Sequence, residues 1–412
     1  MFTNVINQRF LFIYISNFIN VYFCNYTILM DYLHLALQFK NRVFTGRYLV
    51  LETVLTELQK FKNGSLTFPA QSVLKQPIPL YTIGFGKTKI LMWSQMHGNE
   101  STTTKAVFDF LAFLNSGSEL SDAILTKITF YIIPMLNPDG AKLYTRENAN
   151  GVDLNRDAQQ LSQPESILLR NLYEQIQPHF CFNLHDQRSI FGVGDLGLPA
   201  TVSFLAPSFN NEREVNSTRL KAMRIIEDMN FELQKIIPNQ IGRFDDQFNL
   251  NCVGDTFQFL GTPTILFEAG HFQADYNREK TREFLFISFV VASKSVSEID
   301  VVRNDSNEYL SIPQNKVNFY DFIYNNVKII VEGNEKIINF AIQYNEVLNN
   351  ASISFIGIIV KINTLEGFYG HQIVDANHEL YFDGLKNYPK INEIANFSLN
   401  NSPQFVKGIK IK

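Results

Sequence analysis

The chain has 412 residues, of which 45% are hydrophobic and 18% are charged, so it is an ordinary globular sequence too long for one small domain. A formal net charge of -4 at pH 7 and the lack of a Lys/Arg-rich block argue against a nucleic acid partner. The three cysteines, Cys24, Cys181 and Cys252, are widely spaced, so we expect neither a disulfide framework nor a Cys-x-x-Cys metal knuckle. This cysteine usage favours a reducing, cytoplasmic location.

Residues 1–30 form an apolar N-terminal extension. Arg9 precedes an apolar run at 10–23 that resembles a signal-peptide core or a membrane anchor. Asn17 and Asn20 interrupt this run, and no small-residue cleavage site follows it. We therefore expect a non-essential extension. Export, or membrane anchoring through residues 1–30, is the alternative, and without such an anchor no membrane contact is expected.

Apolar runs and amphipathic stretches alternate through residues 31–299, which we predict to be the larger domain. Strands are expected at 89–96, 128–135, 179–186 and 262–270. Helices are expected at 102–114, 164–176 and 211–236, the first of them capped by Ser101 or Thr102. This alternation predicts a doubly wound α/β fold, with a mixed, mostly parallel sheet and helices on both faces.

The pattern changes near residue 300. Short strand-like runs separated by Asn/Gly turns follow at 327–333, 336–344, 353–362 and 379–384. Little in this segment resembles a long helix. Residues 300–412 are therefore predicted to form a smaller, β-rich C-terminal domain.

Three short motifs stand at the carboxyl ends of three predicted strands: HGNE at 97–100, LHD at 184–186 and FEAG at 267–270. Ligands of open α/β sheets bind outside this edge of the sheet, so the motifs are expected to converge. His97, Glu100 and His185 offer two nitrogens and one carboxylate, which is the ligand set of a catalytic zinc site with an open fourth position. Taken alone, each of these residues is more often structural than metal-binding. Their shared position at one edge of the predicted sheet favours a metal site.

A polar loop follows the strand at 128–135. It begins with the turn sequence Asn-Pro-Asp-Gly at 137–140 and carries Arg146 and Arg156. These two arginines are either ordinary solvated side chains or planar donors that bind a carboxylate and stabilise an oxyanion.

Together these motifs resemble the zinc metallocarboxypeptidase family over roughly residues 46–296. The shared motifs are HGNE, NPDG, R-x-N-x-x-G-V-D-L-N-R at 146–156, NLH at 183–185 and FEAGH at 267–271. The resemblance implies a catalytic domain at 31–299, one zinc per chain held by His97, Glu100 and His185, and Glu268 as general base. It also implies that Arg146 polarises the scissile carbonyl.

Three further roles follow from the resemblance. Asn155 and Arg156 would grip the terminal carboxylate of the substrate, and Asp153 would orient His97. The digestive members of the family carry a tyrosine about twenty residues before the glutamate, whereas this sequence has none between Tyr173 and Tyr276. Substrate preference is therefore left open.

Two alternatives accompany the carboxypeptidase hypothesis. The first is a deacylase of the aspartoacylase or succinylglutamate-desuccinylase type, acting on a small N-acyl amino acid instead of a peptide. The second is an inactive binding protein on the same scaffold, which the full set of catalytic residue types disfavours.

Overall fold

The computed structural model describes residues 32–298, 307–400 and 402–411. The predicted extension at 1–30 and the predicted domain boundary at 299/300 lie outside these residues. None of the helices in the described ranges is long and apolar enough to cross a membrane.

An eight-stranded sheet runs through the first part of the described chain, with the order β1-β2-β4-β3-β5-β9-β7-β8. The strands are β1 (Ser65–Gln71), β2 (Pro77–Gly84), β3 (Thr88–Ser94), β4 (Ile128–Ile133), β5 (Phe180–Asp186), β7 (Val202–Leu205), β8 (Ile241–Arg243) and β9 (Thr264–Ala269). The four central strands, β4, β3, β5 and β9, are parallel, while β2 joins β4 and β7 joins β9 in antiparallel pairs. The mixed, mostly parallel sheet expected from the sequence is confirmed.

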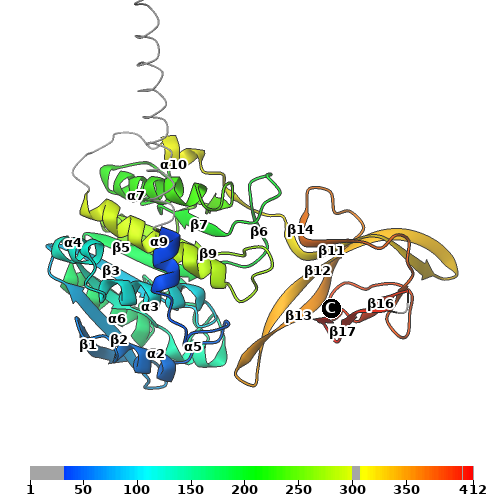
Figure 1. Ribbon diagram of the computed structural model, residues 1–412, viewed down its shortest axis with the longest axis horizontal. Helices are drawn as coiled ribbons and strands as arrows, with labels where there is room; N and C mark the ends of the chain where they lie inside the picture. Colours follow the sequence, from blue (N-terminus) through cyan, green and yellow to red (C-terminus); the bar gives the residue numbers. More distant parts are fainter. Residues whose placement is uncertain (1–31, 299–306, 401, 412) are drawn as a thin grey trace, which may run out of the picture.

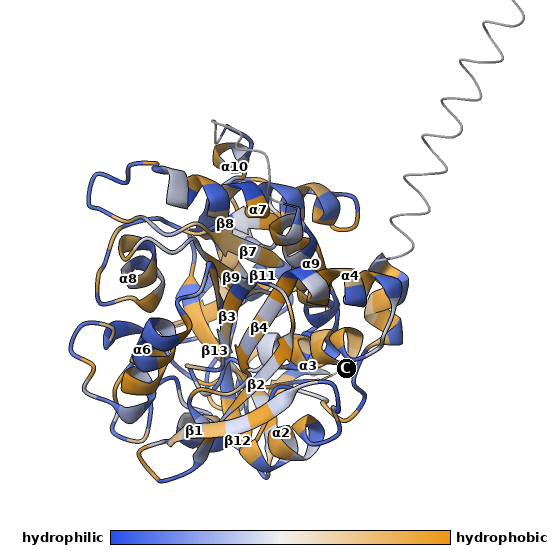
Figure 2. Ribbon diagram, turned by 90° about the vertical axis from the view of Figure 1, so that its left-hand side faces the viewer, coloured by the Kyte–Doolittle hydropathy of each residue, from blue (hydrophilic) through white to orange (hydrophobic). Residues whose placement is uncertain are grey.

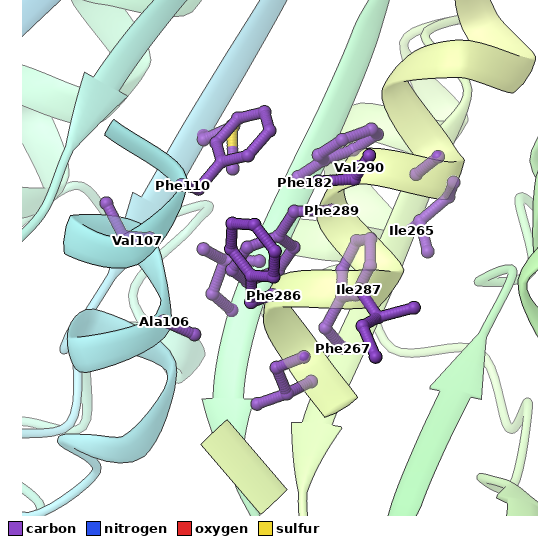
Figure 3. Packing of buried hydrophobic residues seen from close by; sticks show 14 of the residues in the cluster. Ala106, Val107, Phe110, Phe182, Ile265, Phe267, Phe286, Ile287, Phe289 and Val290 are labelled. Carbon is purple, nitrogen blue, oxygen red and sulfur yellow. The ribbon is translucent and has the colours of Figure 1, made fainter. Parts of the chain in front are cut away.

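The sheet separates two hydrophobic cores, because successive side chains of a strand point to opposite faces. In β3, Ile90 and Met92 join the larger core, and Leu91 and Trp93 join the core on the other face. Figure 2 shows the helices on the two sides of the sheet, and Figure 3 shows the larger core between α3, α9 and the strands. The larger core is covered by α2 (Leu51–Leu58), α3 (Thr102–Leu114), α4 (Glu119–Lys127), α7 (Ser217–Gln234) and α9 (Glu279–Ser297), and the other by α6 (Pro164–Ile176) and α8 (Val253–Phe259).

The C-terminal part is rich in strands and has its own core (Figure 1). Its first segments still contact the large sheet domain: α10 (Asn307–Ser311) packs on α7, and β10 (Asn315–Val317) pairs with β6 (Phe191–Val193). Two four-stranded sheets follow, β13-β12-β11-β14 and β15-β16-β17-β18. Their strands are β11 (Phe319–Val331), β12 (Asn334–Asn349), β13 (Ser352–Ile362), β14 (Tyr369–Asp375), β15 (Tyr381–Phe382), β16 (Phe397–Leu399), β17 (Ser402–Val406) and β18 (Ile409–Lys410).

Candidate metal and substrate site

Three side chains converge at the carboxyl ends of β3 and β5. His97 and Glu100 lie on the turn between β3 and α3, and His185 is the penultimate residue of β5. His97 Nδ1 lies 2.9 Å from Glu100 Oε1, and His185 Nδ1 lies 2.8 Å from Glu100 Oε2. The two imidazole Nδ1 atoms are only 3.1 Å apart. All three side chains are buried, and one ligand atom from each lies within 4.8 Å of the others.

This donor set fits a zinc ion. Two imidazole nitrogens aimed at each other gain little by themselves, but with a carboxylate they form three corners of a tetrahedral site. Among the described residues, His97, Glu100 and His185 form the one cluster of His, Cys, Asp or Glu side chains whose atoms are close enough to hold a metal. The ligand convergence expected from the sequence is therefore present in the fold.

The turn that carries His97 owes its shape to a close backbone approach. A Cβ added to Gly98 would lie 1.9 Å from the carbonyl carbon of Gly140, so only glycine fits here. Gly140 belongs to the short helix α5 (Pro138–Leu143), whose N-cap Asn137 accepts a hydrogen bond from Gly140 N at 2.9 Å. The Asn137 amide also donates to Met96 O at 3.1 Å. The HGNE and NPDG motifs therefore form one packed unit.

Asp186 connects the second ligand strand to the first turn of α3. Its carboxylate accepts hydrogen bonds from Thr102 N at 2.9 Å and Thr103 N at 3.2 Å. Ser101, the expected cap, makes no side-chain cap bond, so this carboxylate satisfies the free amides at the helix start instead. The backbone N–H of Asp186 donates to Glu100 Oε2 at 3.1 Å. The residue after His185 thus fixes the orientation of Glu100.

Asp153 holds three groups of the site at once. Its Oδ1 lies 3.0 Å from His97 Nε2 and accepts from Asn155 N at 2.9 Å, while Oδ2 accepts from Arg146 Nε at 3.1 Å. A carboxylate only accepts hydrogen bonds, so His97 carries its proton on Nε2 and leaves Nδ1 free to bind a metal. Arg146 also reaches Glu100 Oε1 at 3.3 Å through Nη1.

Glu268 lies on β9 directly beside His185 in the parallel register. Its Oε2 is buried without a hydrogen-bond partner. Burial, with the nearby charges of Glu100 and Asp186, raises the pKa of Glu268 well above its usual range. Burial acts the same way on Glu100, but the imidazoles of His97 and His185 prevail and hold its pKa well below that range. The pocket therefore contains two carboxyl groups whose pKa values are shifted in opposite directions, as is common in acid–base sites.

Asn155 and Arg156 lie on the 3-10 turn η1 (Leu154–Arg156). The Asn155 side chain accepts from Val253 N at 3.0 Å, and Arg156 Nη1 donates to Asn155 O at 2.8 Å. The same Nη1 lies 3.2 Å from Cys252 Sγ. No carboxylate of the described residues pairs with Arg156, so its charge is available to a ligand.

One cavity of about 1020 Å³ is lined by the proposed metal ligands and by Arg146, Asn155, Arg156 and Glu268. Asp153 does not line it. The cavity also contains residues that the sequence did not point to, from a distant strand of the chain: Tyr344 and Glu346, both on β12. Tyr144, at the end of α5, completes this part of the wall. Arg243 does not line this cavity, and its Nε donates to Ile312 O at 3.3 Å.

One known family matches the part of the chain that carries most of this site. Residues 62–183 match the profile described as zinc carboxypeptidase; the match includes His97, Glu100, Arg146 and Arg156 and ends before His185 and Glu268. This part of the chain is therefore similar to zinc carboxypeptidases. The resemblance inferred from the motifs is confirmed.

Two fungal carboxypeptidases are similar to a short part of the chain. Over 100 residues it is 27% identical to the probable carboxypeptidase 2 of Arthroderma benhamiae and to carboxypeptidase 2 of Trichophyton rubrum. These matches cover 24% of this chain and only 19% of each fungal protein.

Among solved structures, a metallo-carboxypeptidase from Burkholderia cenocepacia is 21% identical with a TM-score of 0.47, covering 61% of this chain and 69% of that one. A metallo-carboxypeptidase from Pseudomonas aeruginosa, in complex with (2-guanidinoethylmercapto)succinic acid, is 14% identical with a TM-score of 0.49. That alignment covers 60% of this chain and 70% of the other.

Proposed function

We propose that this protein is a zinc metallocarboxypeptidase that hydrolyses the C-terminal peptide bond of its substrate. The observation that supports this most is the convergence of His97, Glu100 and His185 in a cavity that also contains Glu268 and the unpaired guanidinium of Arg156. A metal site alone would fit many hydrolases. An accessible arginine in the same cavity adds a means of selecting a free terminal carboxylate.

His97, Glu100 and His185 would hold one zinc ion. Bound zinc acts as a Lewis acid and makes water a nucleophile near neutral pH. Glu268 takes the proton of the attacking water with its unpartnered Oε2 and passes it to the departing amine.

Three side chains orient the substrate in this proposal. Arg146, held by Asp153, donates to the carbonyl oxygen as negative charge develops there. Arg156 binds the terminal carboxylate through two parallel hydrogen bonds, and Asn155 supports it from the same turn. The scissile carbonyl then lies between Arg156 and the metal ligands.

The test is turnover of matched substrates by zinc-loaded protein. We expect peptides with a free C-terminal carboxylate to be cleaved and the same peptides with an amidated C-terminus to be poor substrates. Glu268→Gln should keep zinc and fold yet lose nearly all turnover, since it removes the proton acceptor and leaves the ligands in place. Glu165→Gln, at a buried carboxylate that does not line the cavity, is the matched control and should retain turnover.

Two outcomes would overturn the proposal. Equal cleavage of free and amidated peptides would exclude recognition of the terminal carboxylate. Preference for N-acyl amino acids over peptides would indicate a deacylase on the same fold.

A further inference from the structure

The hairpin of β12 and β13 brings the C-terminal part of the chain into the zinc carboxypeptidase cavity. Tyr344, Asn345, Glu346 and Val347 line the same space as the candidate metal ligands. In Figure 1 this hairpin extends from the C-terminal part back toward the large sheet domain. One wall of the cavity is therefore built by residues about 160 to 250 positions away in sequence from the metal ligands.

Glu346 anchors this wall to the catalytic domain. Its Oε1 lies 3.1 Å from Arg47 Nη1, and its Oε2 accepts a hydrogen bond from the hydroxyl of Tyr144. Arg47 is itself buried and lies 3.9 Å from Asp186. A buried guanidinium between two carboxylates is costly to disturb, so the hairpin has one defined position here.

The backbone of the hairpin is held at a second place. Asp321 on β11 is fully buried and accepts from Tyr344 N at 2.6 Å and from Tyr276 Oη at 2.9 Å. Gln343 donates to Ser189 Oγ at 2.9 Å. Together with the pairing of β10 and β6, these bonds join the two parts as a fixed interface rather than a loose contact.

A chain of contacts places this wall relative to the reaction. It runs from Arg156 through Asn155 and Asp153 to His97, and from Glu100 through Asp186 and Arg47 to Glu346. Arg156 is thus linked to the metal ligands through His97, and Glu346 is linked to them through Glu100. A peptide with its carboxylate on Arg156 and its scissile carbonyl at the ligands would have the hairpin left as the wall for its N-terminal side.

We propose that the β12–β13 hairpin is the wall against which the substrate binds on the N-terminal side of the scissile bond, and that it restricts cleavage to short peptides. This inference rests on the proposed carboxypeptidase function. The cavity of about 1020 Å³ has room for a few residues, and the hairpin closes one side of it. Tyr344 is the residue expected to contact the substrate, and Glu346 is a positioning residue.

The test measures kcat/KM for N-acetylated peptides that share one C-terminal dipeptide and grow from dipeptide to hexapeptide. For the wild type we expect kcat/KM to fall by about tenfold or more across the series. Tyr344→Ala should reduce this fall to about threefold or less, because it opens the wall. The double variant Asn345→Ala/Val347→Ala truncates two exposed lining residues, so it keeps the test valid if Tyr344→Ala fails to fold.

Glu335→Gln is the matched control, because Glu335 lies on the same strand β12, is exposed and does not line the cavity. It should show the wild-type length profile. The proposed role of the hairpin would be wrong if kcat/KM of the wild type did not depend on peptide length, or if both wall variants kept the wild-type dependence. Either result would leave the carboxypeptidase function in place. No hydrolysis of any peptide in the series by zinc-loaded wild type would overturn the proposed function and the wall with it.

Discussion

Asp153→Asn should weaken metal binding although Asp153 is not one of the proposed ligands. The carboxylate accepts hydrogen bonds on both oxygens, from His97 and Asn155 on Oδ1 and from Arg146 on Oδ2. An asparagine has a single oxygen, so its NH₂ group must face a donor on one side. If it faces His97, the imidazole moves its proton to Nδ1 and can no longer bind the metal. If it faces Arg146, that arginine loses its anchor, and His97 keeps only a neutral oxygen, which holds its N–H more weakly than a carboxylate does.

The expected size of the effect follows from this geometry. Loss of the partner that orients a metal-binding histidine costs about 10- to 100-fold in metal affinity. This factor corresponds to about 1.4 to 2.7 kcal/mol of binding free energy. A zinc titration against a competing chelator at pH 7 measures the change directly, and circular dichroism checks that the fold is kept.

Asp157→Asn is the control, because this neighbouring carboxylate is buried and accepts from Ser162 and Gln163 without lining the cavity. It should lower stability and leave the zinc dissociation constant unchanged. A zinc dissociation constant for Asp153→Asn within about twofold of wild type would refute the role assigned to Asp153.

Three further outcomes are expected. His185→Ala should abolish retention of the single zinc in native mass spectrometry, and full occupancy would contradict the ligand assignment. Arg156→Ala should lower kcat/KM about 10- to 100-fold on substrates with a free carboxylate while amidated ones change little, and Arg156→Lys should rescue it only in part. Gly98→Ala should cost about 2 kcal/mol or more in a denaturant titration, because the new Cβ meets the Gly140 backbone 1.9 Å away; an unchanged midpoint would show that the turn can relax.

The elements that the sequence predicted best are those whose ends are marked by the flanking residues. α3 at Thr102–Leu114 and α6 at Pro164–Ile176 coincide with the predicted helices, since flanking turns and apolar spacing mark both ends. α9 was not predicted. Its sequence, EKTREFLFISFVVASKSVS, follows Arg278, which is not a capping residue, so nothing marks where the helix starts.

The candidate site could also be predicted only in part from the sequence. The positions of His97, Glu100, His185 and Glu268 could be inferred because each follows an apolar strand, and parallel strands end at one edge of the sheet. Tyr344 and Glu346 could not be inferred, because nothing local marks them. The Glu346 bond to Tyr144 joins residues 202 positions apart, and only the docking of the C-terminal part creates it.

The ion pair between buried Arg47 and half-buried Glu346 also limits how this protein can diversify. Because Glu346 is partly exposed, its loss costs less than the roughly 3–5 kcal/mol of a fully buried pair, but it leaves the buried Arg47 with Asp186 alone, 3.9 Å away. A foreign β-rich segment grafted onto this catalytic domain would leave the Arg47 guanidinium without its carboxylate, unless the graft supplied an equivalent acid. The two parts are therefore poor candidates for exchange as independent modules. Substitutions at positions 47 and 346 should be inherited together.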